Sequence, residues 1–200
     1  MKLTQLVMAT GNKGKLAELR ALLAPLRIEV LSPADCGVEG MEVEETGETF
    51  EQNALIKALA YMRATGLAAV ADDSGLSVDA LEGAPGVHSA RYGGPGLGDA
   101  DRVALLLEQL EALPVEARGA HFTSAIALAL PEGDGFVVTG ECYGTLTREP
   151  DGEGGFGYDP IFFYAPEGCT FAVMAPEVKN RVSHRAVAMR LFLEELEKRL

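Results

Sequence analysis

The sequence predicts an α/β fold, in which a mixed β-sheet carries helices on its faces. Short apolar segments typical of buried strands alternate with segments of helical spacing, and this alternation indicates parallel strands with crossover helices. Two long apolar segments joined by a short turn sequence predict one antiparallel hairpin. The 200 residues are 48% hydrophobic, which is enough to build a core in a single domain spanning residues 1–200.

The first strand is expected over residues 3–9, followed by a loop, Thr10–Lys15, and a helix that ends near Pro25. A strand, a glycine-containing loop and a helix present backbone N–H groups to an anion. Two lysines in the loop add positive charge. The loop is not a Walker A motif, because its two glycines are too close together. An ordinary helix start would give a similar pattern.

A second strand is expected over residues 28–31, and residues 46–66 are expected to form a loop that enters a helix. Thr49 and Gln52 have the spacing of a capping box, and Gly66 is a typical C-terminal stop. Asn53 and Lys57 are four residues apart and share one face of this helix. A solvent-exposed position would account for Lys57.

An apolar segment over residues 67–71 predicts a buried strand that ends at Asp72-Asp73-Ser74-Gly75, with another strand over 76–81. Two carboxylates at such a point are costly to bury unless they are paired, hydrogen-bonded or bound to a metal. Carboxylates on a loop suit Mg²⁺. Alternatively, both are solvated turn residues that cap backbone amides.

A long glycine-rich loop over residues 82–98 precedes a helix over 99–110, for which Asp99 is the expected cap. The hairpin strands are expected over 120–130 and 136–147. A further strand is expected over 160–164, after a glycine-rich loop.

That second glycine-rich loop contains Gly152-x-Gly154-x-x-Gly157, the spacing of a dinucleotide-binding fingerprint. We reject that function because prolines flank the loop and no helix opens from it after a strand. The loop instead places Phe156, Tyr158 and Asp159. The aromatic rings either stack on a base or fill the edge of the core.

The last helix is expected to begin at Ser183, a favourable N-cap, with four basic residues at or before its start: Lys179, Arg181, His184 and Arg185. Cations are unfavourable at a helix N-terminus, so their presence indicates a bound anion. A frayed basic helix start is the alternative.

The net charge of −13 argues against binding to nucleic acid or to anionic membranes. Three scattered cysteines, Cys36, Cys142 and Cys169, lack metal-ligand spacing and suit a reducing cytoplasm. No apolar run is long enough for a transmembrane helix. We therefore expect a cytoplasmic protein with no membrane or nucleic-acid partner.

Five motifs occur in one order: TGNKGK (10–15), ETGETFEQNALIKA (45–58), ADDSGLSVDALEGAPGVHSARY (71–92), GGFGYDPIFF (154–163) and KNRVSHR (179–185). Together they resemble the inosine triphosphate pyrophosphatase family over nearly the whole chain. The resemblance implies an elongated mixed sheet flanked by helices, with two lobes around a central cleft. It also implies a homodimer, a Mg²⁺ requirement and hydrolysis of ITP, dITP and XTP to the monophosphate and pyrophosphate.

The same resemblance assigns roles to individual residues. Asp73 is the implied catalytic residue and a metal ligand, with Glu45 as the second metal ligand. The implied substrate-binding residues are Thr10, Gly11, Asn12, Lys13, Gly14, Lys15, Ser74, Phe156, Gly157, Tyr158, Asp159, Lys179, His184 and Arg185. The chain departs from the family pattern at Gln52, where Glu is frequent, and at His88, where Tyr is frequent.

These residues suggest attack of water on the α-phosphorus, with Asp73 positioning the water and Lys15 stabilising the leaving group. Donors aimed at a 6-keto oxygen would select hypoxanthine and xanthine over adenine. Two alternatives remain open: a pyrophosphatase for modified pyrimidine or methylated nucleotides, and a nucleotide-sensing module without turnover.

Overall fold

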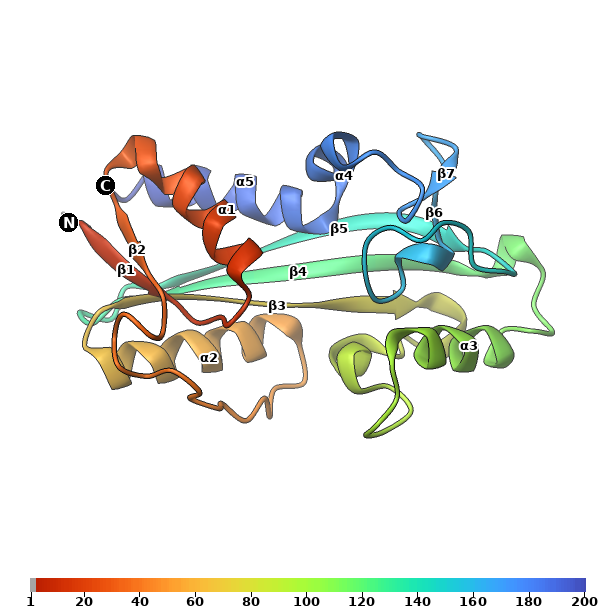
Figure 1. Cartoon of the computed structure of the whole chain (residues 1–200), viewed down its shortest axis with the longest axis horizontal. Coiled ribbons are helices and arrows are strands. Elements are labelled where there is room, and N and C mark those ends of the chain that lie inside the picture. The colour runs from red at the N-terminus through yellow and green to blue at the C-terminus, as the bar shows by residue number, and fades with distance from the viewer. Residues whose placement is uncertain (1–2) are drawn as a thin grey trace. The chain divides into compact units, whose positions relative to one another are not determined.

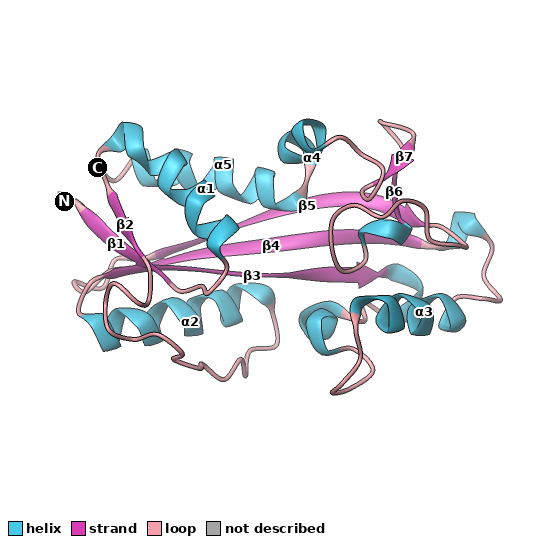
Figure 2. Cartoon of the chain, in the orientation of Figure 1, coloured by secondary structure: helices cyan, strands magenta, loops and turns pink. Residues whose placement is uncertain are grey.

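The computed structural model describes residues 3–200 as a seven-stranded sheet with helices on its faces (Figures 1 and 2). The strand order is β2-β1-β3-β4-β5-β6-β7. The strands are β1 (Gln5–Met8), β2 (Glu29–Leu31), β3 (Ala68–Val78), β4 (Gly119–Ala129), β5 (Phe136–Leu146), β6 (Phe162–Tyr164) and β7 (Cys169–Thr170). The helices are α1 (Lys13–Leu23), α2 (Phe50–Thr65), α3 (Asp99–Gln109), α4 (Pro176–Val182) and α5 (His184–Glu197).

The sheet is mixed, as the sequence predicted. Strand β1 pairs in parallel with both β2 and β3, whereas β6 pairs antiparallel with β5 and β7. Strands β4 and β5 are neighbours in the sheet and are joined by a short turn, as expected for the hairpin.

The chain divides into two compact units. The first unit comprises Met1–Asp73, Ala125–Thr139 and Ala188–Leu200, and the second comprises Ser74–Ser124 and Gly140–Val187. Each unit has its own apolar core. The elements β3, β4, β5 and α5 contribute residues to both units.

In the first unit, the alternation of side chains along β1 separates two apolar layers. Leu6 and Met8 pack in one cluster with residues of α1 and α5, including Leu19 and Phe192. Val7 packs in another cluster with Tyr61 of α2. Helices α1 and α2 therefore cover opposite faces of these strands (Figure 1).

In the second unit, aromatic rings fill the core. Phe122 of β4 lies 4.7 Å from Phe162 and 5.9 Å from Phe171, measured between ring centroids. Helix α3 adds Val103 and Leu106 to this cluster. Val103 and Leu106 are three residues apart and therefore lie on the same buried face of α3.

The prediction of a turn at Asp72–Gly75 is wrong, because β3 continues through these residues from Ala68 to Val78. The turn-forming residues do not end this strand. Because successive side chains of a strand point to opposite faces of the sheet, Asp72 and Asp73 face different neighbours, and each neighbour supplies a lysine.

Two further expectations about helix starts need correction. Helix α1 begins at Lys13, so that Gly14 and Lys15 lie in its first turn, and Asn12 is the N-cap. Helix α3 has Gly98 as its N-cap, and the side chain of Asp101 accepts a hydrogen bond from the Gly98 N–H. Asp99 is the first helical residue, which leaves its carboxylate available to another segment.

The expectation that four basic residues crowd one helix start is also wrong. Lys179 and Arg181 lie in the last turn of α4, where the helix dipole favours cations. Ser183 separates α4 from α5, and its hydroxyl accepts a hydrogen bond from the Ala186 N–H, which confirms its capping role. Only His184 and Arg185 lie in the first turn of α5.

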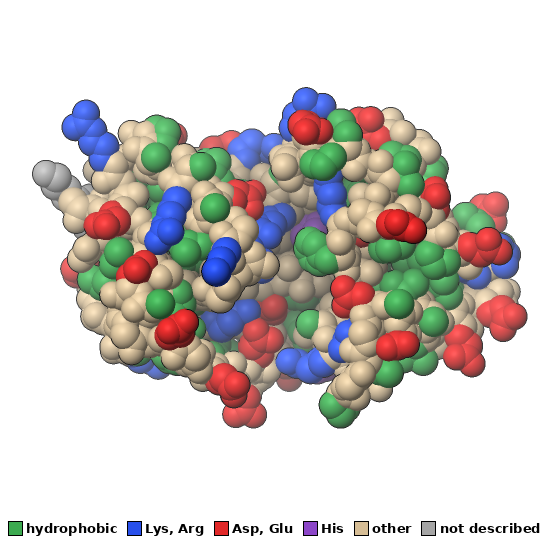
Figure 3. Space-filling model, in the orientation of Figure 1, with side chains coloured by type: hydrophobic (Ala, Val, Ile, Leu, Met, Phe, Trp, Pro, Cys, Tyr) green, Lys and Arg blue, Asp and Glu red, His purple; other side chains and the backbone are tan. Residues whose placement is uncertain are grey.

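On the face drawn in Figure 3, acidic and basic side chains are interspersed rather than gathered into a basic stripe. Within residues 3–200, none of the helices is both long and apolar enough to cross a membrane.

Arg118 is a buried cation in the second unit, and its hydrogen-bond partners within the described part of the chain are backbone carbonyls. Its side chain donates to the oxygens of Leu110 at 2.7 Å, Leu113 at 3.1 Å and Thr147 at 3.0 Å. The first two carbonyls lie at and just beyond the end of α3, where carbonyl groups lack helical partners. Burial lowers the pKa of Arg118 from its usual value. Arg118 therefore holds the end of α3 to the strand that follows it.

We expect Arg118→Met to reduce the free energy of unfolding by about 2 to 4 kcal/mol, because buried carbonyls lose their donors. Urea denaturation measures this change. Arg190→Met, at an exposed position of α5, is the matched control and should change stability little. Equal effects of both substitutions would contradict this role for Arg118.

Candidate functional site

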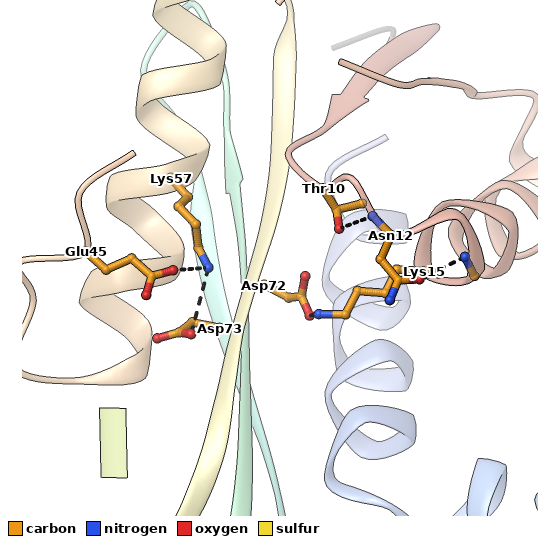
Figure 4. Close-up of polar contacts among 8 residues, drawn as sticks. Thr10, Asn12, Lys15, Glu45, Lys57, Asp72 and Asp73 are labelled. Atoms are coloured by element: carbon orange, nitrogen blue, oxygen red, sulfur yellow. Dashed lines mark hydrogen bonds and ion pairs between the residues drawn. The ribbon is translucent and has the colours of Figure 1, made fainter. Parts of the chain in front are cut away.

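In the first unit, two carboxylates from distant parts of the sequence meet one lysine (Figure 4). Nζ of Lys57 in α2 lies 2.7 Å from Oε1 of Glu45 and 3.8 Å from Oδ1 of Asp73. The side chain of Asp73 is 13% exposed and that of Lys57 is 18% exposed. The interpretation of Lys57 as a solvent-facing lysine is therefore wrong.

The loop that carries Glu45 is fastened to the start of α2. The Gly47 N–H donates to Oδ1 of the fully buried Asn53 at 2.8 Å. A side chain at Gly47 would meet that oxygen at 2.6 Å, so the close approach requires glycine. Thr49 caps α2 as predicted, but Gln52 accepts from the Glu48 N–H instead of completing a capping box with Thr49.

The Glu45 and Asp73 carboxylates suit a hard divalent cation. Both converge on the same positive charge, which in this structure is the Lys57 ammonium group. Among the described residues, no group of three or more His, Cys, Asp or Glu side chains forms a metal cage. Mg²⁺ often binds through only one or two carboxylates and retains several waters, so these two residues could hold it.

Asp72 points to the other face of β3, where Nζ of Lys15 in α1 lies 2.6 Å from its Oδ2 (Figure 4). The Asp72 side chain is only 8% exposed. A carboxylate buried to this extent needs a charged partner. Lys15, expected to bind phosphates, thus also neutralises Asp72.

The turn before α1 is organised by Asn12. Its Oδ1 accepts from the N–H groups of Gly14 at 2.9 Å and Lys15 at 3.1 Å, and its own N–H donates to the Thr10 hydroxyl at 3.2 Å. Gly11 and Lys13 lie exposed at the same turn. The six predicted substrate-binding residues from Thr10 to Lys15 thus lie together at a helix N-terminus, a favourable position for an anion.

The second unit contains a pocket of about 150 Å³. Six of the predicted substrate-binding residues line it, namely Ser74, Phe156, Gly157, Tyr158, Asp159 and His184. Six other residues complete the lining: Gly75, Ser89, Ala90, Asp99, Arg102 and Phe122. Residues from six stretches of the sequence between positions 74 and 184 thus form one site.

Two carboxylates hold the glycine-rich loop that forms part of this pocket. The Phe156 N–H donates to Oδ2 of Asp159, and the Gly157 N–H donates to Oδ2 of Asp99, both at 2.8 Å. Asp159 is almost fully buried and forms an ion pair with Lys179 of α4. Gly155 has a φ of 74° and passes close to Asp159, so a side chain would not fit there.

Aromatic side chains form the walls of the pocket. Phe156 is 70% exposed, and its ring lies 5.3 Å from Nζ of Lys179. The ring of His184 stacks on Phe122 with centroids 4.7 Å apart. Tyr158 is buried, and its hydroxyl donates to the Ser89 carbonyl at 3.0 Å. Tyr158 therefore packs in the core while it also lines the pocket.

Among the second-unit residues predicted to bind substrate, Lys179 and Arg185 do not line the pocket, and neither does His88. Lys179 supports the pocket through Asp159. His88 accepts a hydrogen bond from Nε of Arg91 at 3.3 Å. The prediction missed Asp99 and Arg102, and their i, i+3 spacing on one helix was the only local signal.

Burial raises the pKa of Tyr158 to about 12. In the unfolded chain the phenol ionises near pH 10, so between these values the unfolded state binds fewer protons and stability falls as pH rises. We expect the free energy of unfolding to fall by up to about 1.4 kcal/mol more per pH unit in the unmodified protein than in Tyr158→Phe.

Denaturant titrations from pH 9 to pH 12 measure this difference. Tyr164→Phe, in the same unit, should retain the steeper dependence. If both variants lose it equally, the effect does not come from Tyr158.

The fold and sequence match proteins of known structure. The Staphylococcus aureus Ham1 protein has a TM-score of 0.92 and 35% identity, with 98% of this chain and 100% of that chain covered. A Mycobacterium abscessus structure described as a nucleoside-triphosphatase and dITP/XTP pyrophosphatase has a TM-score of 0.81 and 50% identity, with 94% of this chain and 98% of that chain covered.

A protein from Geobacter sulfurreducens named dITP/XTP pyrophosphatase is 50% identical over 97% of each chain. One of the same name from Geobacillus kaustophilus is 47% identical over 96% of this chain and 94% of its own length. These relatives define the class of the protein as a pyrophosphatase, as the sequence predicted.

Residues 6–195 match the model of the Ham1 family, and the chain belongs to this family. The resemblance seen in the five motifs is confirmed at this level, and so is the mixed sheet flanked by helices.

Proposed function

We propose that this protein hydrolyses the non-canonical purine nucleotides dITP, XTP and ITP to the monophosphate and pyrophosphate, with Mg²⁺ as cofactor, and so removes them from the nucleotide pool. The observation that carries this proposal is the convergence of Glu45 and Asp73 on one positive charge. The names of the relatives, dITP/XTP pyrophosphatase, support the choice of substrates. We further propose a cytoplasmic homodimer, on the resemblance alone.

The reaction breaks one phosphoanhydride bond. The oxygen of a water molecule bonds to the α-phosphorus, the bond from that phosphorus to its bridging oxygen breaks, and pyrophosphate leaves. In this proposal, Asp73 holds the attacking water by a hydrogen bond and accepts its proton. Glu45 and Asp73 would hold Mg²⁺, which supplies charge neutralisation to the phosphate oxygens.

Positively charged groups of the first unit bind the phosphates of the substrate in this proposal. Lys15 lies in the first turn of α1, so its positive charge adds to the positive end of the helix dipole. Because Asp72 holds its ammonium group, Lys15 is oriented before a phosphate arrives. Such preorganised charge stabilises a leaving pyrophosphate without a cost of reorganisation.

The pocket of the second unit suits the base. A cavity of about 150 Å³ holds an aromatic ring such as benzene, so this pocket admits a planar heterocycle better than a triphosphate chain. Phe156 offers an exposed ring for stacking. Ser74 lines this pocket and follows Asp73 directly in β3, so one strand contributes to both groups of residues.

We expect Asp73→Asn to lower kcat for dITP by about 10² to 10⁴-fold, because the general base is lost. Glu45→Gln should also lower turnover, and chelation with EDTA should abolish it reversibly. Chromatographic detection of dIMP and pyrophosphate measures each effect. Parallel assays with dATP and a modified dUTP distinguish the proposed substrates from those of other nucleotide pyrophosphatases. Full turnover by Asp73→Asn would remove Asp73 from this role.

Asp72 and Asp73 provide a matched pair for testing the metal site. Added Mg²⁺ should raise the melting temperature of the unmodified protein, since a ligand that binds the folded state stabilises it. Asp73→Asn should remove this shift, whereas Asp72→Asn should retain it because Asp72 faces Lys15. Loss of the shift in both variants would contradict the assignment of Asp73 and Glu45 as the ligands.

A further inference from the structure

Arg102 of α3 is a charged residue in the wall of the pocket that no motif identified. Its side chain is only 14% exposed. Three aromatic residues, Phe122, Phe156 and Tyr158, line the same pocket, together with polar residues that include Asp99. A guanidinium group in such surroundings has lost most of its contact with water and needs hydrogen-bond acceptors.

The described part of the chain does not supply those acceptors. The nearest carboxylate oxygen, Oδ1 of Asp99, is 3.7 Å from Nη1 of Arg102, which is too long for a hydrogen bond. Nε of Arg102 is buried without a partner. Within residues 3–200, the structure shows no hydrogen bond from this guanidinium group.

Arg118 shows what a purely structural arginine looks like in the same unit. Arg118 is only 1% exposed, whereas Arg102 is partly buried, and the side chain of Arg118 donates to three backbone carbonyls. Buried polar groups are nearly always satisfied in this way. Because Arg102 is not, and because it lines a pocket, an acceptor on a ligand is the missing partner.

We propose that Arg102 is a specificity-determining residue that donates hydrogen bonds to the acceptor edge of a 6-keto purine, formed by the keto oxygen and N7. The planar fork of a guanidinium group matches these two acceptors, which are spaced as they are in guanine. Adenine presents an amino donor in place of the keto oxygen and would leave one arginine donor unpaired. This inference rests on the proposed function.

Asp99 is the positioning residue for this contact. One of its oxygens accepts from the Gly157 N–H at 2.8 Å, and the other lies near the Arg102 guanidinium group. Asp99 therefore ties the glycine-rich loop, which carries Phe156, to the helix that carries Arg102. The loop that carries the stacking ring and the helix that carries Arg102 are thus joined by one side chain.

The test combines a protein variant with an altered base. Arg102→Met, Arg102→Lys and the exposed control Arg148→Met are assayed for pyrophosphate release from dITP, 7-deaza-dITP and dATP. We expect Arg102→Met to lower kcat/KM for dITP by about 10- to 100-fold and to reduce the preference for dITP over dATP. Removing N7 should lower kcat/KM in the unmodified protein but not in Arg102→Met. Arg102→Lys keeps the charge without the fork and should recover only part of the preference.

A role in phosphate binding gives a different result. If Arg102 contacts phosphate, inhibition by tripolyphosphate should weaken in Arg102→Met, whereas our inference predicts no change. The inference is also overturned if Arg102→Met keeps the preference over dATP and the sensitivity to N7. If Arg102→Met does not fold, a full preference in Arg102→Lys overturns it.

Failure of the proposed function is seen separately, as absence of pyrophosphate release from dITP by the unmodified protein. In that case, calorimetric binding of IMP and AMP to the unmodified protein and to Arg102→Met still tests the contact. Equal preferences in the two proteins would overturn it.

Discussion

The structure of the first unit depends on how β3 accommodates two adjacent negative charges. Burying a carboxylate is costly unless a charged partner meets it. Strand geometry sends Asp72 and Asp73 to opposite faces, and the helix on each face supplies one lysine, Lys15 or Lys57. The two ion pairs let the strand continue where its sequence favours a turn. They also place a carboxylate beside Glu45.

The second unit uses carboxylates differently, to hold a glycine-rich loop in place. Asp159 and Asp99 each accept one N–H from the glycine-rich loop, at Phe156 and Gly157. Asp159 is balanced by Lys179, which the chain itself provides. Near Asp99 stands Arg102, whose donors have no hydrogen-bond partner within residues 3–200. Lys179 therefore makes a structural ion pair with Asp159, whereas we assign the donors of Arg102 to the substrate.

The sequence predicted the class of fold, the order of most elements and many of the residues that lie around Lys57 and Lys15 or line the pocket. It failed where local preference and tertiary context disagree. The turn predicted at Asp72–Gly75 is strand, because neighbouring helices neutralise its charges. The basic residues near 180 are partly in α4, where Lys179 is favourably placed. Arg102 was missed because the spacing of residues in a helix does not show which pocket its polar face lines.

Apolar spacing, cap residues and the five ordered motifs were enough, by themselves, to determine the mixed sheet, its helices and membership of the Ham1 family. They suffice because periodicity and capping are local properties of the chain. Only the tertiary structure decided which charge meets which partner: Lys57 with Glu45 and Asp73, Lys15 with Asp72, and Asp99 with Gly157. Such pairs join residues up to 58 positions apart, and the packing of helices on strands brings them together.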